Sequence, residues 1–188
     1  MNKYLAAFRD CMQVIADASE AEKDPHRKAI LDNFLRHAAL EFSGQDEKIL
    51  TPEMTVDHPV YHVKWGSNLA TYDGMEAVQG YYNAVNEVVS TFQDHTCWVN
   101  DWGIASYSKF VRFTTGKALA AEGADIEADD TTYAQLLPMA MFWKYDENAK
   151  LIGEDVFMLT DPSYERVGEG EMFSVAELHD VARSFLRS

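Results

Sequence analysis

The spacing of apolar residues changes along this chain, and that change constrains the fold more than any other feature of the sequence. In most of the first half, apolar side chains recur every three or four residues, which is the spacing of amphipathic helices. From His95 onward they alternate with polar side chains, which is the spacing of half-buried strands. Helices followed by a run of strands predict an α+β domain, in which helices cover one face of a curved antiparallel sheet.

The predicted elements are bounded by residues that typically end or start them. Asp24-Pro25 separates the first two helices, Ser43-Gly44 ends the second, and Ser174 with Glu177 forms a capping-box pattern for the last. The predicted helices span residues 2–22, 25–42, 75–91 and 174–185, with a helical turn at 45–50. The predicted strands span residues 55–62, 95–99, 104–115, 132–145 and 151–160. The predicted irregular segments are 66–74, 161–173 and the acidic segment 118–130, which we expect to form a solvated lid or hairpin tip.

The length of 188 residues favours one domain that spans the whole chain, residues 1–188. Hydrophobic residues make up 47% of it, which is enough for a sizeable core and excludes a mostly disordered chain. We expect the core of the domain at about residues 28–160. A helix at 1–24 precedes this core, and an extension at 161–188 follows it.

The strong negative charge limits the partners that this chain can have. A formal net charge of -15 repels phosphate backbones and anionic membrane surfaces, so neither nucleic acid nor a membrane is an expected partner. The sequence contains no run of about 18 apolar residues, so we expect no membrane span. It has only two cysteines, Cys11 and Cys97, and its N-terminus does not resemble a secretory signal. These features favour a cytoplasmic protein.

The stretch 55–62 contains two histidines at a spacing that suggests a site. Strand side chains alternate between faces, so Val56, His58, Val60 and His62 are predicted to share one side. If that side faces the interior, it is an apolar wall that carries two imidazoles able to titrate near neutral pH.

Three stretches, taken in order, resemble the nuclear transport factor two-like superfamily. They are Thr-Val-Asp-His-Pro at 55–59, Gly-Met-Glu-Ala-Val-Gln-Gly-Tyr-Tyr at 74–82, and Phe-Trp-Lys-Tyr-Asp at 142–146 followed by Lys-Leu-Ile-Gly-Glu-Asp at 150–155. This superfamily includes ketosteroid isomerases, scytalone dehydratase and SnoaL-like polyketide cyclases. The resemblance implies a cone-shaped α+β barrel, in which N-terminal helices and a curved antiparallel sheet enclose a pocket.

The resemblance also implies roles for particular residues. His58 stands where the isomerases have their carboxylate base, and His37 aligns with the tyrosine that donates to the developing oxyanion. Tyr82 matches the tyrosine that supports this donor, whereas Met141 replaces the second oxyanion donor. By these residues the chain is not a ketosteroid isomerase, so the resemblance implies the same pocket with changed chemistry.

Two sets of side chains are the candidate site residues. The predicted catalytic residues are His58, His37 and Glu154. The predicted substrate-binding residues are His62, Tyr72, Tyr81, Tyr82, Met141, Trp143, Tyr145 and Glu41. A metal site was weighed, because histidines and a glutamate could converge, but no compact ligand motif is present, and we expect no metal and no cofactor.

The leading hypothesis is a cofactor-independent acid–base enzyme, a lyase or isomerase, that acts on a hydrophobic aromatic or polycyclic small molecule. Elimination, retro-aldol cleavage, dehydration and double-bond shifts all need only proton transfer and oxyanion stabilisation. Some relatives in the catabolism of aromatic compounds are lyases of this kind. The alternative is a non-catalytic binding or assembly module with the same fold. The outer face of the sheet commonly forms dimers in this superfamily, so we expect a homodimer or a higher homo-oligomer.

Overall fold

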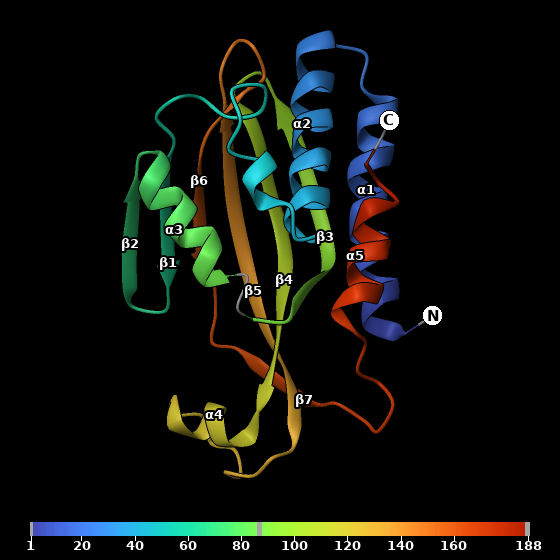
Figure 1. Ribbon diagram of the computed structural model, residues 1–188, viewed down its shortest axis with the longest axis vertical. Coiled ribbons are helices and arrows are strands. Elements are labelled where there is room, and N and C mark those ends of the chain that lie inside the picture. Colours follow the sequence, from blue (N-terminus) through green and yellow to red (C-terminus); the bar gives the residue numbers. More distant parts are fainter. Residues whose placement is uncertain (1, 86–87, 187–188) are drawn as a thin grey trace.

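The structure is a computed structural model that describes residues 2–85 and 88–186. In Figure 1, helices α1, α2 and α5 lie to the right of the long strands of the sheet, and a small unit of β1, β2 and α3 lies to their left, where β1 and β2 continue the same sheet. The elements are α1 (Lys3–Ala21), α2 (Pro25–Glu41), the 3₁₀ turn η1 (Asp46–Lys48), β1 (Val60–Trp65), β2 (Asn68–Asp73), α3 (Met75–Val85), β3 (Ser90–Asn100), β4 (Gly103–Thr115), α4 (Gly116–Ala121), β5 (Thr132–Tyr145), β6 (Leu151–Met158), β7 (Ser163–Arg166) and α5 (Val175–Arg183).

The helices begin at residues whose side chains satisfy free backbone N–H groups. The Asn2 side chain accepts from the Tyr4 amide at the start of α1, and Asp24 accepts from two amides at the start of α2. In α5, Ser174 and Glu177 form the predicted capping box. The predicted first, second and last helices are therefore confirmed to within a few residues.

The sheet has the strand order β2-β1-β6-β5-β4-β3, and β7 pairs with β5. Its two edge strands, β2 and β3, do not pair with each other, so the sheet curves without closing. The predicted α+β class is confirmed, but the sheet is not purely antiparallel, because β1 and β6 run parallel. These two strands lie far apart in the sequence, and parallel neighbours require such a long crossover between them.

Several predicted boundaries are wrong, for physical reasons. The expected loop 66–74 contains β2, an edge strand with five of its six residues exposed, so burial does not alternate along it. The expected helix 75–91 is too long, because β3 already begins at Ser90; residues 86–87 of that prediction lie outside the described residues. The strand expected at 55–62 begins only at Val60, after Pro59. The two expected irregular segments near the end contain α4 and β7.

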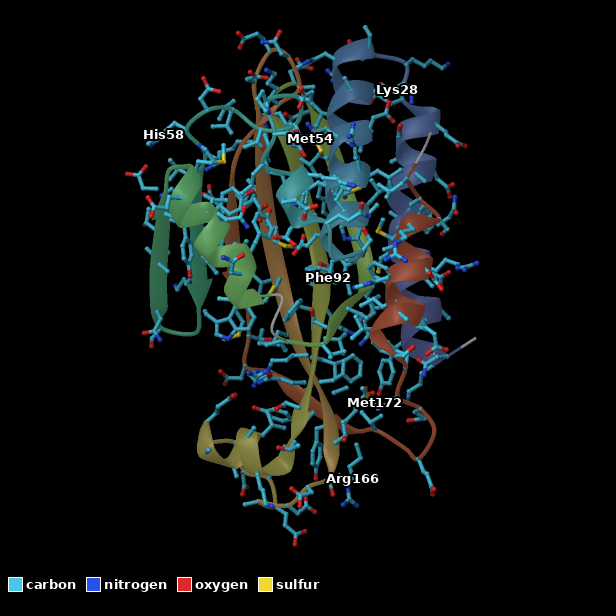
Figure 2. All side chains as sticks on the ribbon, viewed as in Figure 1. Lys28, Met54, His58, Phe92, Arg166 and Met172 are labelled. Atoms are coloured by element: carbon cyan, nitrogen blue, oxygen red, sulfur yellow. The ribbon has the colours of Figure 1, made fainter. Side chains whose placement is uncertain are left out.

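The N-terminal helix and the C-terminal extension pack into the same core as the sheet. Helix α1 buries eight residues, and its Phe8 ring lies 4.8 Å from the ring of Phe42 beyond α2. Phe113 of β4 contacts Tyr4 of α1 and Phe173 before α5, with ring centroids 4.8 and 5.3 Å apart. Figure 2 shows side chains filling the space between the helices and the sheet. No described helix has both the length and the apolar character needed to cross a membrane.

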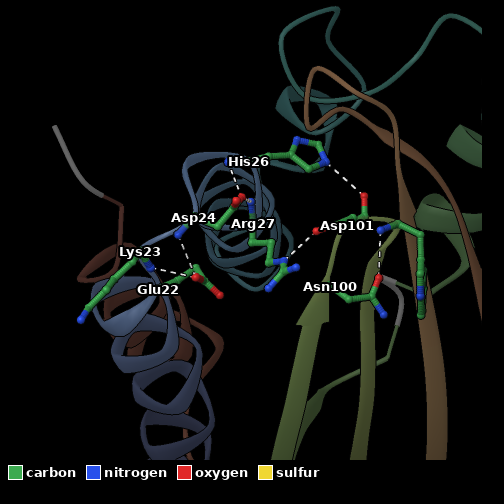
Figure 3. A network of polar contacts seen from close by, with 8 residues as sticks. Glu22, Lys23, Asp24, His26, Arg27, Asn100 and Asp101 are labelled. Atoms are coloured by element: carbon green, nitrogen blue, oxygen red, sulfur yellow. Dashed lines mark hydrogen bonds and ion pairs between the residues drawn. The ribbon is translucent and has the colours of Figure 1, made fainter.

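Polar contacts fix the N-terminal end of α2 to the turn between β3 and β4 (Figure 3). Arg27 Nε donates to Asp101 Oδ1 over 2.7 Å, and His26 Nε2 lies 3.1 Å from the Asp101 carbonyl oxygen. Further along α2, Asn33 donates to the carbonyl oxygens of Met54 and Ala149, both at 2.9 Å. These contacts set the position of α2 on the sheet and therefore the position of the side chains on its inner face.

Candidate functional site

A mostly apolar cavity, which we call the large cavity, lies between the unit of β1, β2 and α3 and the inner face of the long strands. Its volume is about 350 Å³, which is within the range of small-molecule pockets. Apolar and aromatic side chains form most of its wall. Those on the sheet are Val63, Trp65, Phe92, Phe110, Met139, Met141, Trp143 and Val156.

Only a few polar groups line the large cavity. Glu41 of α2 is the one carboxylate and Arg112 of β4 the one cation among the described residues in its wall. Tyr72 and Tyr81 contribute phenols from β2 and α3. An apolar pocket with a few polar groups is the usual form of a site that binds and orients an organic molecule.

A smaller cavity of about 40 Å³ lies behind the large one, between α1, α2 and the sheet. Glu41 lines both cavities. His37, His95 and Ser108 line the smaller one, and His37 Nδ1, His95 Nε2 and Ser108 Oγ are buried without a hydrogen-bond partner among the described residues. Burial lowers the pKa of His95 to about 4, so this imidazole is neutral at pH 7. The smaller cavity is therefore apolar in its walls but carries three free polar atoms.

Four buried side chains form a hydrogen-bond network centred on the hydroxyl of Tyr82. This hydroxyl donates to Glu154 Oε1 over 3.2 Å, and it lies 2.9 Å from His37 Nε2 and 3.0 Å from the hydroxyl of Tyr61. Since the hydroxyl has only one proton, His37 and Tyr61 act as donors to it in this arrangement. The Nδ1 atom of His37 is then the ring nitrogen that can accept a proton.

Burial sets the protonation state of this network. It raises the pKa of Glu154 well above the ordinary value of 4.5, and repulsion by Glu41 adds to the effect. Burial, followed by the charge that Glu154 would carry, also raises the pKa values of Tyr61, Tyr81 and Tyr82. Burial therefore favours the protonated form of Glu154, and the tyrosines remain hydrogen-bond donors.

His37 connects the network to the cavities. His37 and Glu41 are one turn apart on α2, and the distance from His37 Nε2 to Glu41 Oε2 is 3.6 Å. The same nitrogen lies 3.6 Å from Glu154 Oε1. The side chains of His37 and Glu154 are 1% and 4% exposed, whereas that of Glu41 is 19% exposed. Glu41, which lines both cavities, thus lies next to a buried imidazole and a buried carboxyl group.

His58, the predicted base, lies outside this site. Its side chain is 72% exposed, and its Nε2 atom lies 2.7 Å from Oδ1 of Asp73, which is also exposed. Figure 2 shows it at the outer edge of the unit of β1, β2 and α3. The prediction failed because strand alternation begins only after Pro59. The expected convergence of His58 with His37 is therefore wrong.

The prediction for His62 is also wrong, because the assumed faces of this strand were reversed. Tyr61 and Val63 are buried, whereas His62 points to the outer face of the sheet. There its Nδ1 atom lies 2.8 Å from Asp155 Oδ1, to which Lys144 Nζ also donates over 2.8 Å. The alternation places Glu154 and Val156 inside and Asp155 outside on the paired strand β6.

The structure brings most of the other predicted residues to one region. Glu41, Tyr72, Tyr81, Met141 and Trp143 line the large cavity. His37, Tyr82 and Glu154 belong to the buried network, whereas Tyr145 is buried and does not line the cavity. Sequence analysis missed Tyr61 and Arg112. A correct assignment of the buried and exposed faces of residues 60–65 would have identified Tyr61. Ser106, Ser108, Phe110 and Arg112 alternate with the residues between them along β4, and this spacing places the arginine on the same face as the other three.

Within residues 2–85 and 88–186, no group of three or more His, Cys, Asp or Glu side chains is arranged to hold a metal ion. The polar groups of the site are therefore considered as proton donors, proton acceptors and ligands for organic molecules. Cys11 is buried and Cys97 is half-buried, and loss of hydration raises the pKa of each thiol to about 11, so neither is a thiolate at neutral pH.

No protein-family model matches the chain, and no curated protein is significantly similar to it in sequence. Among solved structures, the chain is similar to a proposed polyketide cyclase from Xanthomonas campestris pv. campestris, with 13% identity over 70% of this chain and 90% of the other, and a TM-score of 0.53. It is also similar to a proposed SnoaL-like polyketide cyclase from Shewanella putrefaciens CN-32, with 9% identity over 77% and 86% of the two chains, and a TM-score of 0.53. At these identities the likeness establishes the fold. The predicted fold, that of the nuclear transport factor two-like superfamily, is confirmed.

Proposed function

We propose that this protein is a cofactor-independent acid–base enzyme, a lyase or isomerase, that acts on a hydrophobic ring-containing molecule bound in the large cavity. One observation carries the proposal. Glu41, the one carboxylate among the described residues in the cavity wall, lies 3.6 Å from the buried imidazole of His37. A carboxylate at the edge of an apolar pocket is suited to remove a proton from carbon.

In the proposed reaction, the Glu41 carboxylate removes a proton from a carbon next to a carbonyl group of the substrate. The electron pair of the broken C–H bond forms the enolate, and its oxygen gains the negative charge. Tyr81, whose phenol keeps its proton because burial raises its pKa, donates a hydrogen bond to that oxygen. Tyr72 is a second phenol in the same wall.

His37, Tyr82 and Glu154 act through Glu41 and are positioning residues. The ring of His37, held by the network around Tyr82, packs beside the carboxylate of Glu41 and limits its position, and the proton that Glu41 has gained is passed back to the substrate. Return of the proton to another carbon completes a double-bond shift. Its transfer to an oxygen that leaves, or that forms when a C–C bond breaks, completes an elimination or a retro-aldol cleavage.

The neighbours in the fold support this class of chemistry. Two of them are named as polyketide cyclases, and closing a carbon ring by an aldol reaction begins with the same enolate. The mostly apolar wall supports a substrate that is largely hydrocarbon, and its aromatic side chains can stack on rings.

The experiment that tests the proposal is solvent exchange at carbon. The ketone 2-tetralone has acidic C–H groups next to its carbonyl, and an enzyme that forms its enolate replaces them with deuterium in D₂O. We expect exchange above the buffer rate with the wild-type protein, followed by proton NMR. Glu41→Gln should reduce this exchange by about 100-fold or more, because a general base contributes 10²–10⁴-fold.

The matched control is Glu76→Gln, which changes an exposed glutamate on α3 and should leave exchange unchanged. Binding of 2-tetralone is measured in parallel from its NMR line widths. A wild-type protein that binds the ketone without accelerating exchange would contradict the enzyme and favour the non-catalytic binding module. Equal exchange in wild type and Glu41→Gln would contradict the assignment of the base.

Self-association also stays a prediction. The outer face of the sheet and its rim expose large apolar side chains, among them Trp98 of β3, Phe142 of β5 and Ile152 of β6. Such a face suits contact with a second copy, because residues on one sheet face can meet their own equivalents across a two-fold axis.

A further inference from the structure

Arg112 is an unusual residue for the wall of this cavity. The chain carries a formal net charge of -15, yet an arginine stands among apolar and aromatic side chains. Its side chain is only 20% exposed. A cation in such a wall loses hydration, and this loss is tolerated only when a partner or ligand compensates for it.

The guanidinium of Arg112 has one recorded partner and one free donor. Its Nη2 atom donates to Glu122, the residue that follows α4, and the Glu122 side chain is 48% exposed. Its Nε atom is buried and has no hydrogen-bond partner among the described residues. Guanidinium groups bind carboxylates through two parallel N–H groups. One of these N–H groups of Arg112 is unpaired, so it can still donate a hydrogen bond to a carboxylate.

The position of Arg112 on β4 separates it from His37. On β4, Ser106 accepts a hydrogen bond from Trp143 Nε1, and the Trp143 ring lies 5.3 Å from the ring of His37. Arg112 lies six residues further along the same strand, which corresponds to about 20 Å of extended chain. Arg112 therefore lies away from His37 but shares the wall of the large cavity with Glu41.

We propose that Arg112 binds a carboxylate of the substrate, so the cavity selects hydrophobic ring-containing acids over their neutral analogues. A carboxylate is favoured over a doubly charged phosphate, because Arg112 is the one cation among the described residues of the wall. The inference that this acid is turned over rests on the proposed function, whereas its binding can be measured without turnover. In the opposing interpretation, the Arg112–Glu122 pair only ties α4 to β4.

The test uses two fluorescent ligands of nearly equal shape, anthracene-2-carboxylate and anthracene-2-carboxamide. Titration of each into the wild-type protein, followed by quenching of tryptophan fluorescence, gives the two dissociation constants. We expect the carboxylate to bind about tenfold more tightly than the amide, since one charge-assisted hydrogen bond from the free Nε–H adds roughly this much. Arg112→Gln should abolish or reverse this preference and leave the dissociation constant of the amide within about twofold.

Two further variants distinguish binding from a structural role. Glu122→Gln removes the competing carboxylate and should increase the preference for the acid, whereas Arg112→Lys should retain only part of it. If the pair is only structural, Arg112→Gln and Glu122→Gln should lower the thermal midpoint similarly and leave the preference unchanged, which would overturn the proposal. If neither ligand binds the wild type, the cavity is not a site for ring-containing molecules, and this proposal falls with the proposed function. If both bind without dependence on Arg112, this proposal alone fails.

Discussion

Two of the histidine–carboxylate pairs among the described residues, His58–Asp73 and His37–Glu154, differ sharply in their surroundings. His58 and Asp73 lie 2.7 Å apart, but their side chains are 72% and 68% exposed. His37 and Glu154 lie 3.6 Å apart, and their side chains are 1% and 4% exposed. The shorter pair lies in solvent at the edge of the molecule, and the longer pair lies next to the cavities. Distance alone would therefore select the pair that lies away from the cavities.

The comparison teaches that burial decides what such a pair contributes. In solvent, water competes for the hydrogen bonds and salt screens the charges, so an exposed pair is worth about 0–1 kcal/mol. In the interior, every polar atom depends on its neighbours, and the loss of one partner leaves another unsatisfied. The buried pair is also linked to Glu41, which gives it access to a ligand.

The largest expected effect is on stability, when one histidine of each pair is truncated. His37→Ala removes a hydrogen-bond partner of Tyr82 and leaves a void, so the free energy of unfolding should fall by about 2–4 kcal/mol. His58→Ala should change it by about 0.5 kcal/mol or less. Chemical denaturation of both variants in the same buffer gives the two values.

A third variant separates the hydrogen bond from the volume of the side chain. His37→Gln restores a polar group of similar reach, and it should recover part of the stability that His37→Ala loses. Equal losses in His37→Ala and His58→Ala would show that the buried network does not stabilise the fold. The contrast between the two pairs would then have no energetic basis.

The sequence predicted the class of fold and most of the wall of the site, because both follow from local spacing. The spacing of α2 predicts that His37 and Glu41 share a face, and the alternation of β5 predicts that Met141 and Trp143 do. Glu154 was likewise identified from alternation along β6. Where an element is regular and half buried, the pattern of its residues is enough to place the side chains.

The errors lie where an element is short or irregular. The face of the 55–62 stretch was misassigned because Pro59 delays the start of β1, and a shift by one residue reverses every side chain of a strand. This single error placed His58 and His62 inside and left Tyr61 out. The role of Arg112 depends on the packing of β1, β2 and α3 against β4, and no local pattern in the sequence specifies that packing.

The next effect concerns pH and the carboxyl group of the buried pair. Between the pKa of an unfolded glutamate, near 4.5, and the raised pKa of folded Glu154, the folded state holds a proton that the unfolded state has lost. The stability contributed by this group therefore falls as pH rises through that window, by at most about 1.4 kcal/mol per pH unit. Glu154→Gln lacks this titration. The stability of wild type relative to Glu154→Gln should decrease from about pH 4.5 upward.

The capping residue Glu177 gives a control of opposite sign. Hydrogen bonds from the backbone and side chain of Ser174 hold the pKa of Glu177 below its ordinary value. The stability that this carboxylate contributes is present above the unfolded pKa and is lost as pH falls through the lowered value. Wild type should therefore lose its advantage over Glu177→Gln on acidification. Parallel curves for Glu154→Gln and Glu177→Gln would contradict the burial of Glu154.

The smallest expected effect concerns the exposed pair, His58 and Asp73. A double-mutant cycle with His58→Ala and Asp73→Asn measures the coupling energy of the exposed pair, which should be below about 0.5 kcal/mol. It should vanish in about 1 M sodium chloride, where the screening length is about 3 Å.

The matched cycle with His58→Ala and Asp57→Asn tests an exposed carboxylate near His58 in sequence and should show no coupling. A His58–Asp73 coupling above about 1 kcal/mol that persists in high salt would mean that this pair is shielded from solvent. Burial would then no longer distinguish the two pairs, and His58 would again be a candidate site residue.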